Sequence, residues 1–199
     1  MSESFLQIKN LSVEFRTFDG TVKAINNLNL ELEKGKTIGL VGETGAGKTT
    51  TALAIMGLIP SPPGVITSGE ILFEGKNLLQ ANKKELQEYR GNKIAMIFQN
   101  PMTSLNPVYT VGHQIAAVIM EHQKISKRDA MQKAGEMLET VGIPKEHLKN
   151  YPHEFSGGMK QRVCIAMGLA CNPSLLIAAE PTAALDVTVQ AQILDLMKG

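Results

Sequence analysis

The stretch Gly42-Glu-Thr-Gly-Ala-Gly-Lys-Thr49 decides the fold, because it matches the phosphate-loop pattern G-x-x-x-x-G-K-[ST]. Its glycines let the backbone turn tightly, so that successive amide N–H groups face inward toward phosphate oxygens. Lys48 reaches the β- and γ-phosphates as a point charge, and the Thr49 hydroxyl ligates Mg²⁺. The pattern therefore predicts a nucleoside triphosphate site.

The residues on either side of this loop predict a strand before it and a helix after it. Residues 37–41, TIGLV, form a short continuous apolar run, which is typical of a fully buried parallel strand. From Lys48 to Leu58 the apolar spacing is helical, and the proline-rich residues 60–64 end it. A helix that begins at Lys48 directs the positive end of its dipole at the bound phosphates.

Farther from the loop, strand and helix patterns alternate along the chain. Leu28, Leu30 and Leu32 alternate with polar residues, as in a half-buried strand. Ser126 begins a helical pattern with an apolar, methionine-rich face, and Gly142 ends it. Further strands are predicted at residues 69–75, 93–98 and 175–179, and further helices after residue 156 and at 186–198. These patterns predict an α/β fold, with residues 100–155 as a helical lobe inserted between two core segments, 1–99 and 156–199.

The composition is that of an ordinary globular protein. Of the 199 residues, 43% are hydrophobic and 20% charged, which excludes a disordered chain. A net charge of +1, with no tryptophan, argues against a nucleic-acid-binding protein. No apolar run approaches the roughly 18 residues that span a bilayer, and no secretory leader pattern is present, so we expect a cytoplasmic chain.

The two cysteines are expected to be reduced. Cys164 and Cys171 are seven positions apart on a predicted helix, which places their Cα atoms about 10 Å apart, too far for a disulfide. No ligand pattern of histidines accompanies them, so a zinc site is not expected either. We predict that both thiols pack as small hydrophobic groups.

Two further motifs are ambiguous when taken alone. Gln99 follows the strand predicted at 93–98, where a plain loop residue is the more common interpretation. In YPHEFSGGMKQR, residues 151–162, Ser156 and two glycines precede a helix. Such a turn presents a hydroxyl and free N–H groups to an anion, although a simple glycine-rich helix cap fits equally well.

Together the motifs resemble those of an ABC transporter ATPase subunit. GETGAGKT, the strand end at Gln99, FSGGMKQR, the apolar strand that ends at Glu180, and Ala184-Leu185-Asp186 occur in that family's order and spacing. IFQNPMTSLNPVYTVGHQI, YPHEFSGGMKQRVCIAM and EPTAALDVTVQAQIL are similar to the peptide/nickel importer group, specifically its dipeptide and oligopeptide ATP-binding subunits. GLIPSPPGVITSGEI resembles the first of the two paralogous ATPases of such systems. The resemblance covers essentially the whole chain.

The resemblance implies a P-loop (RecA-like) nucleoside triphosphatase core with an N-terminal antiparallel β portion and an inserted helical lobe. It implies ATP and Mg²⁺ as ligands, with Thr49 and Gln99 on the metal. Glu180 would polarise the attacking water, and Gln99 and Lys48 would complete the catalytic set. The phosphate cradle implied by the family comprises Gly42, Glu43, Thr44, Gly45, Ala46, Gly47, Lys48, Thr49 and Thr50.

Other implied positions lie away from this cradle. Ser156, Gly157 and Gly158 match the signature motif, which in this family contacts the γ-phosphate held by the opposite subunit of a head-to-tail dimer. Asp186 would lie at the dimer seam. An aromatic residue upstream of the loop usually stacks on adenine; Phe15 and Phe18 are both candidates, and Phe18 is favoured.

The implied function is that of an ATP-binding subunit of an importer for di- or oligopeptides, or for a related substrate such as nickel. Its expected partners are two polytopic permease subunits, with either a paralogous ATPase or a second copy of itself. A substrate-binding protein would act indirectly, and no nucleic acid is expected. The expected location is the cytoplasmic face of the cell membrane.

Three departures from the family pattern bear on hydrolysis. Ala179 stands where the family has an Asp that helps to hold Mg²⁺, and Ala183 stands where Thr is expected. The sequence stops at Gly199, before the family's switch histidine. We therefore expect nucleotide binding with poor hydrolysis. A hydrolysis-deficient nucleotide-binding module and a soluble ABC ATPase outside transport remain the alternatives; a small-molecule kinase has no need of FSGGMKQR.

Overall fold

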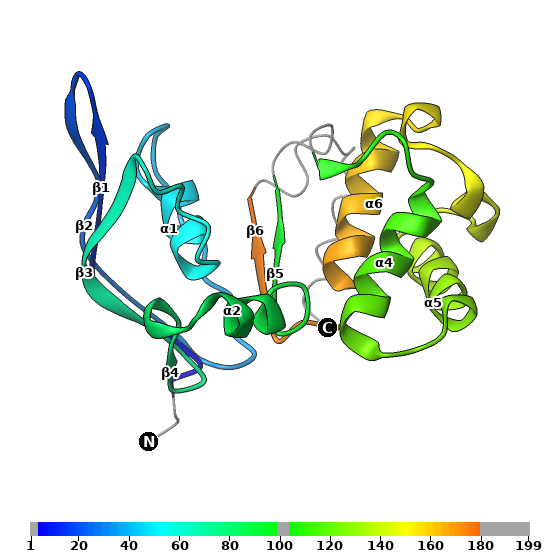
Figure 1. The fold of residues 1–199 in the computed structure, drawn as a ribbon, viewed down its shortest axis with the longest axis horizontal. Coiled ribbons are helices and arrows are strands. Elements are labelled where there is room, and N and C mark those ends of the chain that lie inside the picture. Colours follow the sequence, from blue (N-terminus) through cyan, green and yellow to red (C-terminus); the bar gives the residue numbers. More distant parts are fainter. Residues whose placement is uncertain (1–3, 99–103, 180–199) are drawn as a thin grey trace. The chain divides into compact units, whose positions relative to one another are not determined.

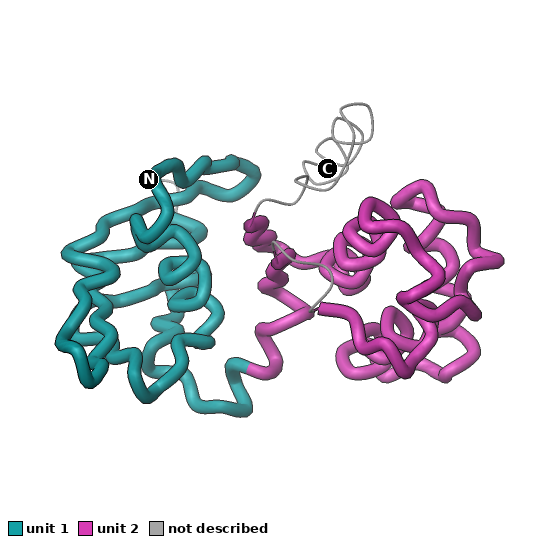
Figure 2. The backbone as a smooth tube through the Cα atoms, turned by 90° about the horizontal axis from the view of Figure 1, so that it is seen from above, with its two compact units in different colours: residues 1–86 teal, residues 87–199 magenta. Residues whose placement is uncertain are grey.

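The computed structural model describes residues 4–98 and 104–179. The chain divides into two compact units, residues 1–86 and 87–199 (Figure 2). Unit 1 contains an antiparallel sheet and the phosphate loop, and unit 2 contains a short parallel strand pair and a helical bundle. The division into segments 1–99, 100–155 and 156–199 is drawn from the sequence pattern, whereas the two units are defined by contacts in the structure. The three-segment division therefore stays a prediction.

The sheet of unit 1 is antiparallel, with strand order β2-β1-β3-β4 (Figure 1). The four strands are β1 Leu6–Thr17, β2 Gly20–Leu32, β3 Gly64–Phe73 and β4 Lys76–Asn77. Alternation decides which face is buried, because successive side chains of a strand point to opposite sides. Leu6 and Ile8 are buried, whereas Gln7 and Lys9 lie on the solvent side. The antiparallel N-terminal β portion is therefore confirmed.

Among the described residues, one helix and a 3₁₀ turn lie wholly in unit 1, and a second helix begins in unit 1 and ends in unit 2. α1 Lys48–Ile55 follows the phosphate loop, and its contacts with β2 place it against the sheet (Figure 1). η1 Leu78–Gln80 and α2 Lys83–Tyr89 follow β4. The predicted helix after the loop is confirmed, with Ile55 as its last residue.

The buried strand predicted at residues 37–41 is wrong for this structure. These residues form no strand, and Ile38, Leu40 and Val41 are 43%, 45% and 95% exposed. An apolar run becomes a strand only when a neighbouring backbone completes its ladder of hydrogen bonds. No segment within residues 4–98 and 104–179 forms such a ladder with 37–41.

Unit 2 is built on a helical bundle beside one parallel strand pair, β5 Ile94–Ile97 and β6 Leu175–Ala178 (Figure 1). Its helices are α4 Val111–Gln123, α5 Lys127–Thr140 and α6 Gly157–Leu169, with 3₁₀ turns η2 Lys145–Lys149 and η3 Pro152–Glu154. Apolar side chains from α4, α5 and α6 form one core, including Ile115, Ile119, Leu138, Val163 and Ile165. Helix α6, which begins directly after Ser156, is thus part of the bundle's core.

The predicted ends of α5 are confirmed. The Ser126 Oγ accepts a hydrogen bond from the Asp129 N–H at 3.2 Å, which caps the helix. At the other end Gly142 has φ +73°, and its N–H and that of Ile143 donate to the carbonyls of Glu139 and Leu138. This is the Schellman arrangement, which favours glycine because its left-handed residue has no Cβ penalty.

The cysteines are free thiols, as predicted: Cys164 is buried in α6 and Cys171 is half-buried. Burial raises the pKa of the Cys164 thiol to about 11, partly opposed by a hydrogen bond with Ser104. Burial also raises the pKa of Cys171. Both thiols are therefore protonated at neutral pH.

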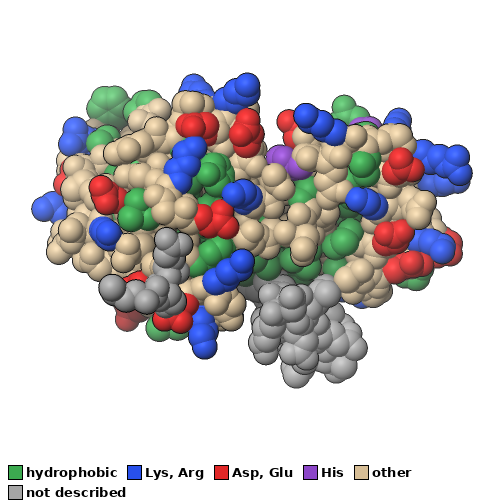
Figure 3. Space-filling model, turned by 90° about the horizontal axis from the view of Figure 1, so that it is seen from below, with side chains coloured by type: hydrophobic (Ala, Val, Ile, Leu, Met, Phe, Trp, Pro, Cys, Tyr) green, Lys and Arg blue, Asp and Glu red, His purple; other side chains and the backbone are tan. Residues whose placement is uncertain are grey.

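Among residues 4–98 and 104–179 there is no helix of the length and apolar character needed to cross a bilayer. On the face drawn in Figure 3, cationic and anionic side chains are interspersed over both units. The helix predicted at 186–198 lies outside the described residues.

Candidate nucleotide-binding site

The phosphate loop of unit 1 depends on glycine at residue 47. Gly47 has φ +82°, and a Cβ atom there would lie 2.4 Å from the carbonyl oxygen of Ala24 on β2. The same atom would lie 3.3 Å from the Ile25 side chain. Only glycine combines this left-handed conformation with so close a backbone approach. The loop is therefore seated directly on β2.

The start of α1 is arranged to receive an anion. Gly47 is its N-cap residue and supplies no side-chain cap, and the first turn contains no acidic residue. The first helical hydrogen bond runs from the Thr51 N–H to the Gly47 carbonyl at 2.8 Å. The amides before Thr51 therefore have no helical acceptor, and the helix dipole adds positive potential at the same end.

Lys48 lies across the loop. Its Nζ donates to the carbonyl oxygens of Gly42 at 2.5 Å and Glu43 at 2.9 Å. Thr49, beside it, is exposed. A loop with bare amides, a flexible ammonium group and an accessible hydroxyl has the chemistry that a Mg²⁺-bound triphosphate requires.

The signature turn lies in unit 2, at the start of α6. The Ser156 Oγ accepts a hydrogen bond from the Met159 N–H at 3.3 Å, and Ser156 and Gly157 are exposed. Phe155, immediately before them, is 5% exposed, and its ring lies edge-on to His147 with centroids 5.8 Å apart. The turn is thus an accessible helix N-terminus next to a buried anchor.

The two aromatic candidates for adenine differ in environment. Phe18 is at the turn between β1 and β2 and is fully exposed. Phe15 is half-buried on β1, and a Cβ at Gly64 would lie 3.2 Å from its ring. Phe18 is therefore the ring with a free face, while Phe15 already packs against β3.

The predicted site residues fall into three groups. Residues 42–50 come together in unit 1, and Ser156, Gly157 and Gly158 come together in unit 2. Gln99, Glu180 and Asp186, together with Ala183, lie outside the described residues. Ala179 is described: it is half-buried after β6, and its N–H donates to the Ile97 carbonyl at 3.0 Å.

Sequence reasoning missed the supports of both turns. The contact of Gly47 with Ala24 spans 23 positions, and Arg162 contacts the end of α5 some 20 positions away. The positive-φ requirement of a glycine can be suspected from sequence, but its neighbour cannot. Distant contacts leave no local pattern.

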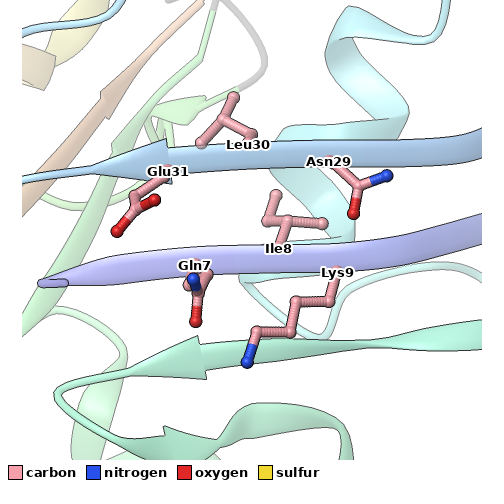
Figure 4. Close-up of a pocket in the computed structure, with 6 residues that line it drawn as sticks. All are labelled: Gln7, Ile8, Lys9, Asn29, Leu30 and Glu31. Carbon is pink, nitrogen blue, oxygen red and sulfur yellow. The ribbon is translucent and has the colours of Figure 1, made fainter.

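A separate shallow hollow lies on the sheet of unit 1 (Figure 4). Side chains of β1 and β2 line it: Gln7, Ile8, Lys9, Asn29, Leu30 and Glu31. It carries one cation and one carboxylate on solvent-facing strand positions, and it lies farther along β2 than the Ala24–Ile25 support of the phosphate loop. The phosphate loop therefore remains the candidate site.

The family profile described as ABC transporter matches residues 25–183 of the chain. This chain belongs to the ABC transporter family. The matched range includes the whole phosphate loop, the signature turn and Ala179. The geometry described above is therefore that of an ABC ATPase cassette.

Several curated proteins are similar to this ABC cassette over nearly all of its length. The oligopeptide transport ATP-binding protein OppD of Bacillus subtilis is 58% identical over 97% of the chain, and the dipeptide transport ATP-binding protein DppD of the same organism is 51% identical over 98%. OppD of Escherichia coli is 50% identical over 98%. The chain spans 54%, 59% and 58% of these relatives' lengths.

Solved ABC cassettes have the same fold. The dimeric post-hydrolysis structure of the ATP-binding cassette MJ0796, bound to ADP and Pi, aligns with 96% of this chain and 81% of its own. The TM-score is 0.86 at 27% sequence identity. A second dimeric structure of MJ0796 aligns equally well. The predicted P-loop class is confirmed.

Proposed function

We propose that this chain is the ATP-binding subunit of an importer for di- or oligopeptides, coupling ATP hydrolysis to transport through permease partners at the cytoplasmic face of the membrane. The phosphate loop carries the proposal, because Gly47, Lys48 and Thr49 form a capless helix start with an adjacent ammonium and hydroxyl group. The 50–58% identity to oligopeptide and dipeptide transport ATP-binding proteins supports the substrate class.

ATP would bind with its phosphates on the amides of residues 42–50. The Lys48 ammonium would exchange the carbonyls of Gly42 and Glu43 for phosphate oxygens. Thr49 would hold Mg²⁺, with Gln99 as the second proposed ligand. When bound, the metal neutralises charge on the phosphates, while the chain's own contribution is positioning and oriented amides.

Titration of Lys48→Ala with a fluorescent ATP analogue tests this site. Loss of a charge-assisted contact costs about 1.5–3 kcal/mol, or one to two decades in affinity. Lys36→Ala, an exposed lysine in the same unit, is the control and should bind like the parent. Unchanged binding by Lys48→Ala would remove the phosphate loop from the proposal.

Ala179 supports a second candidate function, nucleotide binding with little hydrolysis. A methyl group follows β6 where the family's carboxylate would help to hold Mg²⁺. Glu180 remains the proposed group for polarising water. Steady-state phosphate release from the purified chain separates the candidates, because brisk release excludes the hydrolysis-deficient one.

The adenine contact is proposed for Phe18, which has the accessible ring. Stacking on an aromatic face is worth roughly 1–3 kcal/mol per base. Phe18→Ala should therefore lower the affinity for ATP more than it lowers the affinity for inorganic triphosphate. If Phe15→Ala rather than Phe18→Ala loses affinity selectively for ATP, the adenine contact is assigned to Phe15 on β1.

A dimer would place the signature turn on a partner's nucleotide. Ser156, Gly157 and Gly158 would contact the γ-phosphate held by a paralogous ATPase or a second copy, with Asp186 at the seam. Two observations support this: the turn is an accessible helix N-terminus, and the two solved structures of MJ0796 are dimeric. ATP-dependent pairing, followed by size-exclusion chromatography, tests it.

The permease partners would dock on an apolar surface of unit 2, formed by Val108, Tyr109 and Tyr151. These side chains are 70%, 49% and 41% exposed. A hydrogen bond of 2.9 Å from the Val111 N–H to the Asn150 carbonyl brings their two loops together. Apolar side chains grouped on a surface are typical of protein–protein contacts.

The loop that carries Val108 and Tyr109 is held rigidly. The Gln114 side chain accepts from the Asn106 N–H at 2.8 Å and donates to the carbonyls of Asn106 and Tyr109, both at 2.9 Å. Such preorganisation lowers the entropy cost of docking.

Val108→Glu tests the docking surface, with Val22→Glu on the β1–β2 hairpin as an exposed control. The Val108 variant should lose co-purification with the permease subunits while its ATP affinity stays unchanged. Equal recovery of permease with both variants would refute this docking surface.

A further inference from the structure

Arg162 connects the signature helix to the end of α5. Its Nη1 donates to the Gly142 carbonyl at 3.0 Å and approaches the Val141 carbonyl at 3.5 Å. The side chain is half-buried. A guanidinium group is suited to this contact because it is permanently charged and carries several donors in one plane.

The two carbonyls belong to the last residues of a helix cap. The Schellman hydrogen bonds from the Gly142 and Ile143 amides go to the carbonyls of Glu139 and Leu138. The next carbonyls along the chain that accept a bond at this helix end, those of Val141 and Gly142, are the ones that Arg162 contacts. The C-terminal end of α5 also carries the negative end of its dipole, which favours a cation. Arg162 therefore completes the cap of α5 from another helix.

The signature turn depends on such anchors because it is itself exposed. Ser156 and Gly157 lie at the surface, and among residues 4–98 and 104–179 the Ser156 hydroxyl has its hydrogen bond within the turn, with the Met159 N–H. Phe155 precedes the turn and is buried, and Arg162 follows it by one and a half turns of α6. Between them these two residues set where the turn points.

We infer that Arg162 is a positioning residue for the signature turn, which it holds by capping the C-terminus of α5. The inference rests on the proposed function, in which this turn contacts the γ-phosphate held by an opposite subunit. A displacement of about 1 Å at such a contact is enough to cost a large part of its effect.

Hydrogen exchange of the full chain tests the inference directly. In Arg162→Ala the amides of Met159 and Lys160, which donate to the Ser156 hydroxyl and carbonyl, should exchange about tenfold faster, the loss expected from one charge-assisted hydrogen-bond pair. Residues 163–169 should be unchanged. Arg162→Lys, which keeps a cation and a donor, should restore most of the protection. Arg128→Ala, an exposed arginine on α5, is the matched control.

The results separate positioning from packing. Unchanged exchange at Met159 and Lys160 in folded Arg162→Ala would overturn the inference, as would equal exchange in the Lys and Ala variants. If Arg162→Ala fails to fold, Arg162→Gln, which loses the charge, decides: acceleration confined to Met159 and Lys160 supports positioning, whereas unchanged exchange there or uniform acceleration throughout α5 and α6 overturns it.

A pairing assay shows the consequence for function. Where ATP drives pairing, Arg162→Ala should need about tenfold more ATP for half-maximal pairing, with unchanged ATP binding by the monomer. Ser156→Arg serves as the reference in the same assay. If Ser156→Arg pairs normally, the proposed role of the signature turn fails, while the exchange pattern still decides whether Arg162 positions it.

Discussion

The N-cap residue of α1 in unit 1 is Gly47, which has no side chain to cap the helix. The N-cap residue of α6 in unit 2 is Ser156, whose Oγ accepts a hydrogen bond from the Met159 N–H. The phosphate loop is shaped by backbone: Gly47 is left-handed and lies directly against the Ala24 carbonyl. The signature turn is shaped by side chains, with Phe155 buried before it and Arg162 bonded to α5 behind it. The two helix starts are therefore sensitive to different substitutions.

Gly47→Ala should have the largest effect. Its Cβ would lie 2.4 Å from a backbone oxygen, so the loop must move, at a cost of about 3 kcal/mol and a loss of more than about a hundredfold in ATP affinity. Gly45→Ala is the matched control: φ is +86° but the space is open, so only the conformational cost of about 1 kcal/mol applies. ATP titration measures both, and equal losses would show that β2 does not shape the loop.

Ala179→Asp should have the next largest effect, a gain in ATP affinity that requires Mg²⁺. A carboxylate after β6 would add a Mg²⁺ ligand, so ATP affinity in Mg²⁺ should rise by about tenfold and fall slightly in EDTA, where the charges repel. Ala178→Asp is the control, because Ala178, the last residue of β6, is exposed whereas Ala179 is half-buried. A gain that is the same in EDTA would contradict the ligand role.

Burial of Cys164 on α6 predicts a smaller effect, a loss of stability at alkaline pH. Because burial raises the pKa of Cys164 from 9.0 to about 11, the unfolded chain loses this proton first as pH rises. The contribution of this thiol to the free energy of unfolding is therefore fully present below pH 9. It is lost between pH 9 and 11, by on the order of 1 kcal/mol. Urea unfolding at pH 8.5 and 10.5 should show less alkaline loss in Cys164→Ala than in the parent. An identical loss would show that the pKa of the Cys164 thiol does not differ between the folded and unfolded states.

Ser156→Arg should have the smallest effect on the monomer. Because the proposed contact of the signature turn is with a nucleotide held by a partner, ATP affinity of the monomer should stay within about twofold, while ATP-driven pairing is blocked by the bulky cation. Chromatography with and without ATP measures the pairing. Loss of ATP binding by the lone monomer would mean that the turn acts in cis.

Several features could be predicted from sequence because they depend on neighbouring residues. Ser126 and Gly142 bound α5 as predicted, since a cap is a local match between a side chain or a glycine and the helix end. The alternation of Leu28, Leu30 and Leu32 likewise gave half-buried positions on β2. The phosphate loop could be placed for the same reason: its conformation is encoded in its own glycines.

The sequence by itself thus determined the loop, the helix ends and the family. Tertiary structure alone decided that residues 37–41 are exposed, that Gly47 lies on Ala24, and that Arg162 caps α5 from 20 positions away. The physical reason is the range of the forces involved. Capping and left-handed turns act within a few residues, whereas strand pairing and burial require a partner that the chain brings from a distance.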